Sequence, residues 1–166
     1  MGKVRTLVLV VLVLALLPAV VSAGTAQAVV GVDDVTVHVG DTFTVPVWIH
    51  GVSNLFGYDV RLPHDQSILQ GVRVDHGGWL VPGFVIRMGF WTWGGPGCNG
   101  YCAWYAMTQL RPSLPVSGSG VLVNVTYTAL QPGTMELVPW AQLSAAGGIP
   151  IYANTQNATV TVLAAK

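Results

Sequence analysis

The segment from residue 89 to residue 105, GFWTWGGPGCNGYCAWY, holds the side chains with the most distinctive chemistry in the chain. It contains three of the six tryptophans and both cysteines, namely Trp91, Trp93, Trp104, Cys98 and Cys102. Exposed indole rings bind sugars or form the centre of protein interfaces, and two nearby thiols form a disulfide or half of a zinc site. The segment is therefore a candidate recognition hairpin. The alternative is that its rings close the open end of a hydrophobic core.

The two cysteines are expected to form a disulfide rather than to bind zinc. No second pair of Cys or His residues lies near them in the sequence to complete four ligands. A bridge between positions four apart needs a tight reversal, because an extended segment would hold the two Cα atoms about 13 Å apart. The intervening Asn99-Gly100 pair is a strong signal for a two-residue hairpin turn. We therefore expect the Cys98–Cys102 bridge to fix the tip of a hairpin.

The other polar residues form no catalytic or metal-binding pattern. A glycosidase needs two carboxylates across the scissile bond, whereas the six Asp residues and Glu136 are scattered among predicted turns and strands. The segment VSGSG at 116–120 lacks the spacing of a nucleophile elbow and leads into a strand. The four histidines are separated by twelve to fourteen residues and offer no pair at metal-ligand spacing. We therefore expect no enzyme, no metal site and no cofactor.

The first residues have the pattern of a secretory signal peptide. Lys3 and Arg5 precede an apolar stretch at 7–17, which is nearer the length of a signal core than the roughly 20 residues of a membrane span. Cleavage after Ala23 or after Ala28 fits the small residues that follow. The sequence thus predicts a signal peptide at 1–23, or 1–28 for the later cleavage site, and one secreted domain at 29–166 with no membrane attachment after cleavage.

The charge of the predicted mature domain argues against nucleic acid and anionic membranes as partners. Without Lys3 and Arg5, the chain keeps five cationic and seven acidic residues. Binding to phosphate-rich surfaces requires a basic face that releases counterions, and this domain has no excess of positive charge.

Period-two alternation recurs along the chain and predicts an all-β domain. The segment at 42–50 places Phe43, Val45, Val47 and Ile49 on one face. Its Pro46 would remove a ladder hydrogen bond, so we expect a sheet edge or a bulge there. The segment at 55–62 turns Phe56, Tyr58, Val60 and Leu62 inward and Asp59 and Arg61 outward. The segment at 120–128 turns Val121, Val123, Val125 and Tyr127 inward.

Further strands are predicted near 35–39, 68–74, 84–91, 101–108, 134–139 and 157–163, between turns rich in Gly, Pro and Asp. About nine short strands, several with one apolar and one polar face, predict a β-sandwich of the jelly-roll or immunoglobulin-like kind.

The order of these segments resembles a cohesin domain. The resemblance rests on VHVGDTFTVPVWIHGVSNLFGYDVRLPHDQSILQGVRV at 37–74 and GVLVNVTYTALQPGTMEL at 120–137, and it extends roughly over residues 30–163. It implies a nine-stranded jelly-roll sandwich and a non-catalytic module that binds dockerin-bearing proteins such as polysaccharide-degrading enzymes, with calcium held by the partner. It also implies a binding face made of strands at about 55–62, 83–91, 101–108 and 134–139.

Asp59 matches an acidic position with which many cohesins bind dockerin, whereas the neighbouring polar position of the family is Gly57 here. In FVIRMGFWTW a regular strand places Phe84, Ile86, Met88 and Phe90 on the apolar face, so Arg87, Trp91 and Trp93 point outward; a bulge at Gly89 would reverse this. The predicted partner-binding residues are Asp59, Arg61, Arg87, Trp91, Trp93 and Trp104. Two other functions remain open: a carbohydrate-binding module whose Trp91, Trp93 and Trp104 stack on polysaccharide, and a structural extracellular adhesion domain.

Overall fold

The computed structural model describes residues 27–80 and 85–166, and it consists of β-strands around one hydrophobic core. The predicted signal peptide and Phe84 lie outside the described residues. Within the described residues, the only helical segment is a short 3-10 turn at Ala146–Gly148, so the all-β prediction is confirmed. No helix in these ranges is long and apolar enough to cross a membrane.

Thirteen strands follow one another along the described residues: β1 (Ala28–Gly31), β2 (Val35–His38), β3 (Thr42–Leu55), β4 (Gly57–Pro63), β5 (Leu69–His76), β6 (Val85–Trp93), β7 (Tyr101–Gln109), β8 (Val116–Ala129), β9 (Gly133–Leu137), β10 (Trp140–Ser144), β11 (Pro150–Ile151), β12 (Ala153–Gln156) and β13 (Ala158–Leu163). The prediction of about nine strands agrees with this order if two consecutive segments of one interrupted strand are counted as a single strand. β1 continues as β2, β9 as β10 and β12 as β13, and β11 is a two-residue addition.

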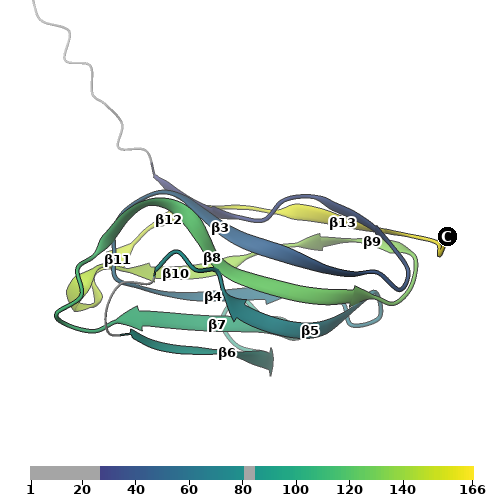
Figure 1. Cartoon of the computed structure of the whole chain (residues 1–166), viewed down its shortest axis with the longest axis horizontal. Coiled ribbons are helices and arrows are strands. Elements are labelled where there is room, and N and C mark those ends of the chain that lie inside the picture. Colours follow the sequence, from purple (N-terminus) through teal and green to yellow (C-terminus); the bar gives the residue numbers. More distant parts are fainter. Residues whose placement is uncertain (1–26, 81–84) are drawn as a thin grey trace, which may run out of the picture.

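The strands form a sandwich of two five-stranded sheets. The strand orders are β12-β1-β3-β8-β5 and β11-β10-β4-β7-β6, and a small third sheet, β2-β13-β9, continues the structure at one end. In Figure 1 the β12-β1-β3-β8-β5 sheet lies in front and the other five-stranded sheet lies behind it. The Tyr58 hydroxyl of β4 donates a hydrogen bond to the Leu122 carbonyl of β8 over 2.8 Å, which joins the two layers through the core.

The face predicted for the strand at 42–50 is confirmed in β3. Val45, Val47 and Ile49 are fully buried, and Phe43 is half-buried at the end of the core. β3 is a central strand, but its neighbour β1 pairs only with residues 48–50, so Pro46 has no strand partner on that side. A register shift against β8 follows directly after Val47. Pro46 therefore has the unpaired side of a sheet edge, and it lies next to a bulge, so both expected features are present.

The inward face predicted for 120–128 is confirmed for Val123, Val125 and Tyr127, but it is wrong for Val121. In the register with β3, Val47 pairs with Val123 and Trp48 pairs with Val121, so Leu122 is an extra residue in β8. The bulge turns Leu122 into the core, where it is fully buried, and turns Val121 to the outside. One inserted residue reverses the alternation for the part of the strand that precedes it.

Candidate partner-binding face

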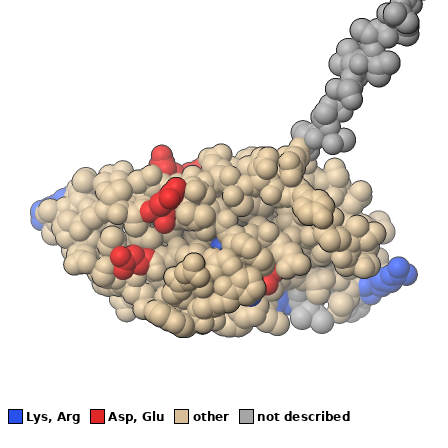
Figure 2. Space-filling view, turned by 180° about the vertical axis from the view of Figure 1, so that it is seen from behind, with Lys and Arg blue, Asp and Glu red and all other residues tan. Residues whose placement is uncertain are grey.

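The outer surface of the β11-β10-β4-β7-β6 sheet presents its side chains in cross-strand rows. In the first row, Trp140 pairs with Arg61, Arg61 with Trp104, and Trp104 with Phe90. In the second row, Gln142, Asp59, Ala106 and Met88 follow one another across β10, β4, β7 and β6. The third row brings Ser144, Gly57 and Thr108 together. We call these rows the outer face; Figure 2 views the molecule from this side and shows a surface that is mostly uncharged.

Arg61 lies at the centre of the first row and is almost completely covered. Its guanidinium carbon lies 4.5 Å from the centre of the Trp104 ring and 5.4 Å from that of Trp140, so both indoles attract the cation. The loop at 94–100 folds over it, because a Cβ added at Gly95 would collide with the guanidinium. Arg61 faces the outer side of the sheet as predicted. It is only 7% exposed, however, so it supports the outer face from below.

Asp59 lies in the second row and is the accessible charged group nearest the centre of the outer face. Its side chain is 27% exposed, and its Oδ1 lies 3.5 Å from Nε of Arg61. A shallow hollow of about 220 Å³ opens beside it, with Ala106 and Gln142 among its walls. The carboxylate therefore has a fixed cation behind it and free space in front of it, which suits it to accept hydrogen bonds from a partner.

Gly57 lies at the end of the same hollow. A Cβ added there would lie 3.1 Å from each of three oxygen atoms, including Oγ1 of Thr108 and Oγ of Ser144. The two hydroxyls thus lie next to the place that a side chain at position 57 would take. The outer face keeps hydrogen-bonding groups at this point although the strand itself has a glycine.

The predicted orientation of the strand at 84–91 is wrong. β6 pairs regularly with β7, yet Met88 and Phe90 face outward and are 47% and 42% exposed, while Trp91 faces the core. The Trp91 ring lies 5.8 Å from that of Tyr101, with the two planes 7° apart, and packs over Gly71. The inner side of β6 also holds Gly89, where a Cβ would collide with the Tyr105 ring. The two glycines make room for aromatic rings on the inner side of β6. They indicate which side of the strand is buried, whereas the alternation of apolar residues indicates the opposite side.

The predicted site residues therefore do not share one surface. Asp59, Arg61 and Trp104 lie on the outer face, Trp91 lies inside, and Trp93 is 75% exposed at the end of β6. Arg87 pairs with the buried Met107 and so lies on the inner side of β6, at the exposed rim of the sandwich. The three indoles that were considered as a sugar platform do not lie side by side. Sequence reasoning did not identify the contributions of Trp140, Gln142, Thr108, Ser144, Met88 and Phe90.

Arg87 instead lies among titratable groups at the rim. Burial lowers the pKa of His76, and the positive charge of Arg87 lowers it further. Burial raises the pKa of Tyr105, and the same arginine opposes this change. Arg87 thus acts on the electrostatics between the two sheets rather than on the outer face.

The strand predicted at 134–139 does not lie in the same sheet as the other three strands of the predicted binding face. β9 pairs with β13 in the small sheet, and the chain joins the outer face only after Pro139, where Trp140 begins β10. The predicted strand corresponds to β9, and Val138-Pro139 separates it from β10, which was not predicted. The fourth strand of the outer face is therefore β10.

The Cys98–Cys102 disulfide is present, and its two Cα atoms lie 6.3 Å apart. The predicted two-residue turn at Asn99-Gly100 is wrong, because seven residues, 94–100, connect β6 to β7. The Gly94 N–H donates to the Gly100 carbonyl over 2.8 Å and closes this loop, and the Cys98 N–H donates to the Gly95 carbonyl over 3.0 Å. The disulfide thus ties the loop that covers Arg61 to the start of β7. Among the described residues, no three His, Cys, Asp or Glu side chains are grouped so as to hold a metal ion.

Comparison with known proteins shows similarity to one family. The family model for the cohesin domain matches residues 28–82. None of the curated protein sequences matches the chain. Similar solved structures include a non-cellulosomal cohesin from the hyperthermophilic archaeon Archaeoglobus fulgidus, with 15% identity and a TM-score of 0.64 over 83% of this chain and 92% of that one.

Two further structures have the same fold. A type I cohesin–dockerin complex from Clostridium thermocellum matches with 12% identity and a TM-score of 0.61, covering 82% of this chain and 95% of that one. A type I cohesin from Pseudobacteroides cellulosolvens matches with 17% identity and a TM-score of 0.62, covering 84% and 94%. The chain thus resembles the cohesin domain over residues 28–82 and shares the jelly-roll sandwich fold of these solved cohesin structures.

Proposed function

We propose that the protein is a secreted, non-catalytic module whose outer face binds a dockerin-bearing protein, such as a polysaccharide-degrading enzyme. The observation that carries the proposal is the position of Asp59, a partly exposed carboxylate beside a hollow in an otherwise mostly uncharged sheet surface. The fold supports it as well, because a similar structure from Clostridium thermocellum is described as a cohesin–dockerin complex. Calcium in such a complex would belong to the partner.

The size of the outer face indicates how such a partner would be seated. Four strands about 4.8 Å apart and three rows about 6.7 Å apart give roughly 400 Å² of sheet surface. One partner of a stable complex usually buries about 800 Å², so binding must extend beyond the rows. Exposed apolar side chains continue the surface past the end of β7, where Leu110 and Leu114 are 41% and 78% exposed. We propose that the partner covers this end together with the outer face.

Phe90 and Met88 supply the apolar part of the proposed interface. The Phe90 ring meets the Trp104 ring edge-on, with 4.6 Å between the ring centres, and Trp104 in turn rests on Arg61. Rings that are held by such contacts lose little conformational entropy on binding. Hydrogen bonds to Asp59 would fix the orientation of the partner, and Phe90 and Met88 would supply apolar contact area.

The proposal is tested by immobilising the protein and passing over it the culture supernatant of the source organism. We expect a protein with duplicated calcium-binding loops to be retained and then released by EDTA. Asp59→Ala should weaken its binding about ten-fold or more, since hydrogen bonds to a charged group contribute about 1.5–3 kcal/mol. Gln70→Ala, an exposed position on β5 of the other sheet, is the matched control and should bind normally. Equal binding by the Asp59→Ala variant, or the absence of any EDTA-released protein, would contradict the proposal.

A further inference from the structure

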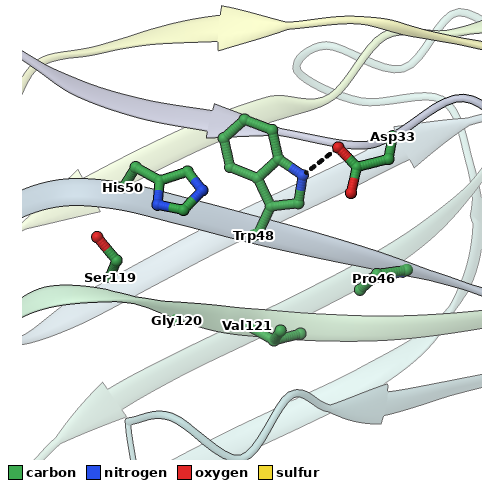
Figure 3. A pocket seen from close by; sticks show the side chains of 7 residues that line it. All are labelled: Asp33, Pro46, Trp48, His50, Ser119, Gly120 and Val121. Carbon is green, nitrogen blue, oxygen red and sulfur yellow. Dashed lines mark hydrogen bonds between the residues drawn. The ribbon is translucent and has the colours of Figure 1, made fainter.

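The opposite surface of the sandwich, on the β12-β1-β3-β8-β5 sheet, carries a hollow of about 420 Å³. Its walls include the side chains of Trp48, Pro46, His50, Asp33, Ser119 and Val121. Figure 3 shows the Trp48 ring beside His50 and Asp33, with Ser119 and Val121 on the neighbouring strand. The hollow lies within the range of about 300–1,000 Å³ that is typical of small-molecule sites. The outer face is on the other side of the molecule, so this hollow does not belong to it.

The irregular pairing of β3 with β8 creates the hollow. The register shifts after Val47 and again after Ile49, and the first shift places Trp48 opposite Val121 on the outside of the sheet. The indole leans over β1, where a Cβ at Gly31 would collide with its six-membered ring. The Trp48 Nε1–H donates to Oδ1 of Asp33 over 3.0 Å. Backbone geometry, the glycine and this hydrogen bond therefore hold the ring in one place.

The groups around the hollow combine an apolar surface with hydrogen-bonding atoms. Pro46, Val121 and the half-buried indole of Trp48 supply the apolar part. The His50 ring, which is exposed, lies 4.6 Å from the Trp48 ring between centres. Ser119 Oγ accepts the Gly51 N–H over 3.1 Å, which leaves its own O–H to donate outward. Asp33 accepts the indole N–H with one carboxylate oxygen, so its other oxygen can accept from a ligand.

A strip of uncharged hydroxyl and amide groups leads away from the hollow along β3 and β8. Thr44 and Thr126 share a hydrogen bond of 3.0 Å between their hydroxyls, and so do Thr42 and Thr128 further on. Asn124 pairs with Pro46 between these threonines and the hollow. From His50 to Thr42 the strand spans roughly 26 Å, which is long enough for several linked ligand units rather than one.

We propose that the Trp48 hollow and this strip bind a neutral saccharide chain. A sugar ring has apolar C–H faces, which pack on an indole, and hydroxyl edges, which match the carboxylate, imidazole and hydroxyl groups at the rim. The ligand is neutral because Asp33 would repel an acidic sugar and the walls of the hollow include no Arg or Lys, while Arg73, which pairs with Thr126 beside the strip, is already ion-paired with Asp75. The site is separate from Asp59, so the module could hold a glycan and a protein partner at the same time.

The test is affinity electrophoresis of the purified protein in gels containing hydroxyethylcellulose, xylan or galactomannan. We expect at least one of these neutral polysaccharides to retard the protein. Trp48→Ala should weaken the retarding interaction ten-fold or more. Trp93→Ala removes a 75% exposed indole from the hairpin instead and is the matched control, which should be retarded like the unmodified protein.

Two further variants keep the test decisive. His50→Ala and Ser119→Ala change exposed side chains at the rim, and each should weaken retardation several-fold even if Trp48→Ala fails to fold. Asp59→Ala should leave retardation unchanged, which separates this site from the proposed protein-binding face. The proposal is overturned if none of the three polysaccharides retards the protein, if the rim variants are retarded normally, or if Trp93→Ala alone loses binding.

Discussion

His64 is packed among aromatic rings and should make the protein unstable in mild acid. It is only 8% exposed, and its ring centre lies 4.9 Å from that of Tyr127, 5.2 Å from Trp91 and 5.4 Å from Tyr101. Burial lowers its pKa from 6.5 to about 4, although the nearby Leu62 backbone and the charge of Asp65 oppose the change. The folded protein therefore favours the neutral imidazole.

The direction and size of the effect follow from the two pKa values. Because the folded-state pKa is lower than the unfolded one, the stabilisation is complete above about pH 6.5 and is lost as the pH falls towards 4. The free energy of unfolding should decrease by about 2 kcal/mol near pH 5 and by about 3 kcal/mol near pH 4 from this residue alone. His76, whose pKa burial also lowers, adds to the loss in the same direction.

Urea unfolding at about pH 7 and pH 5, followed by tryptophan fluorescence, measures the effect. His64→Phe keeps a ring in the aromatic cluster and removes the titrating group, so this variant should lose about 2 kcal/mol less than the unmodified protein between the two pH values. Gln70→Ala, at an exposed position without a titratable group, should show the unmodified pH dependence. The reasoning is refuted if His64→Phe and the unmodified protein lose the same free energy on acidification.

Two further predictions concern the bulge in β8 and the disulfide. Leu122→Ala should lower the free energy of unfolding by about 2–5 kcal/mol, whereas Val121→Ala, on the outer side, should lower it by less than about 1 kcal/mol; urea titration of both decides, and the opposite order would show that β8 has no bulge there. Joint replacement of Cys98 and Cys102 by serine should cost about 2 kcal/mol, because the bridge closes a loop of only five residues. A loss well above this in urea unfolding would mean that the loop covering Arg61 needs the bridge to fold.

The alternation of apolar and polar residues correctly predicted the buried side of those strands in which the alternation is regular. Val45, Val47 and Ile49 of β3, and Tyr58, Val60 and Leu62 of β4, are buried as expected, and Asp59 is on the outside. In these strands the pattern is regular and the buried side chains are all apolar. The burial of each of these side chains then follows from the sequence of its strand alone.

The predictions failed where a neighbouring strand decides the outcome. Met88 and Phe90 look like the buried face of β6, but Gly89 and Gly71 make space for large rings on the inner side, and this is visible only when β5, β6 and β7 are in place. Arg61 was expected to be exposed, but a loop more than thirty residues later in the chain covers it. The bulge at Leu122 likewise depends on the register with β3.

The parallel pairing of the first and last strands determines how the domain bears mechanical force. β1 lies beside β12 and β2 beside β13, with four residue pairs in each ladder, and both pairs run in the same direction. Tension applied at Ala28 and at Leu163 would pull the two strands of each pair in opposite directions along their length (Figure 1). Their hydrogen bonds would then be loaded in shear, all together, instead of being opened one after another. A module tethered through its two ends would resist drag without first losing its terminal strands.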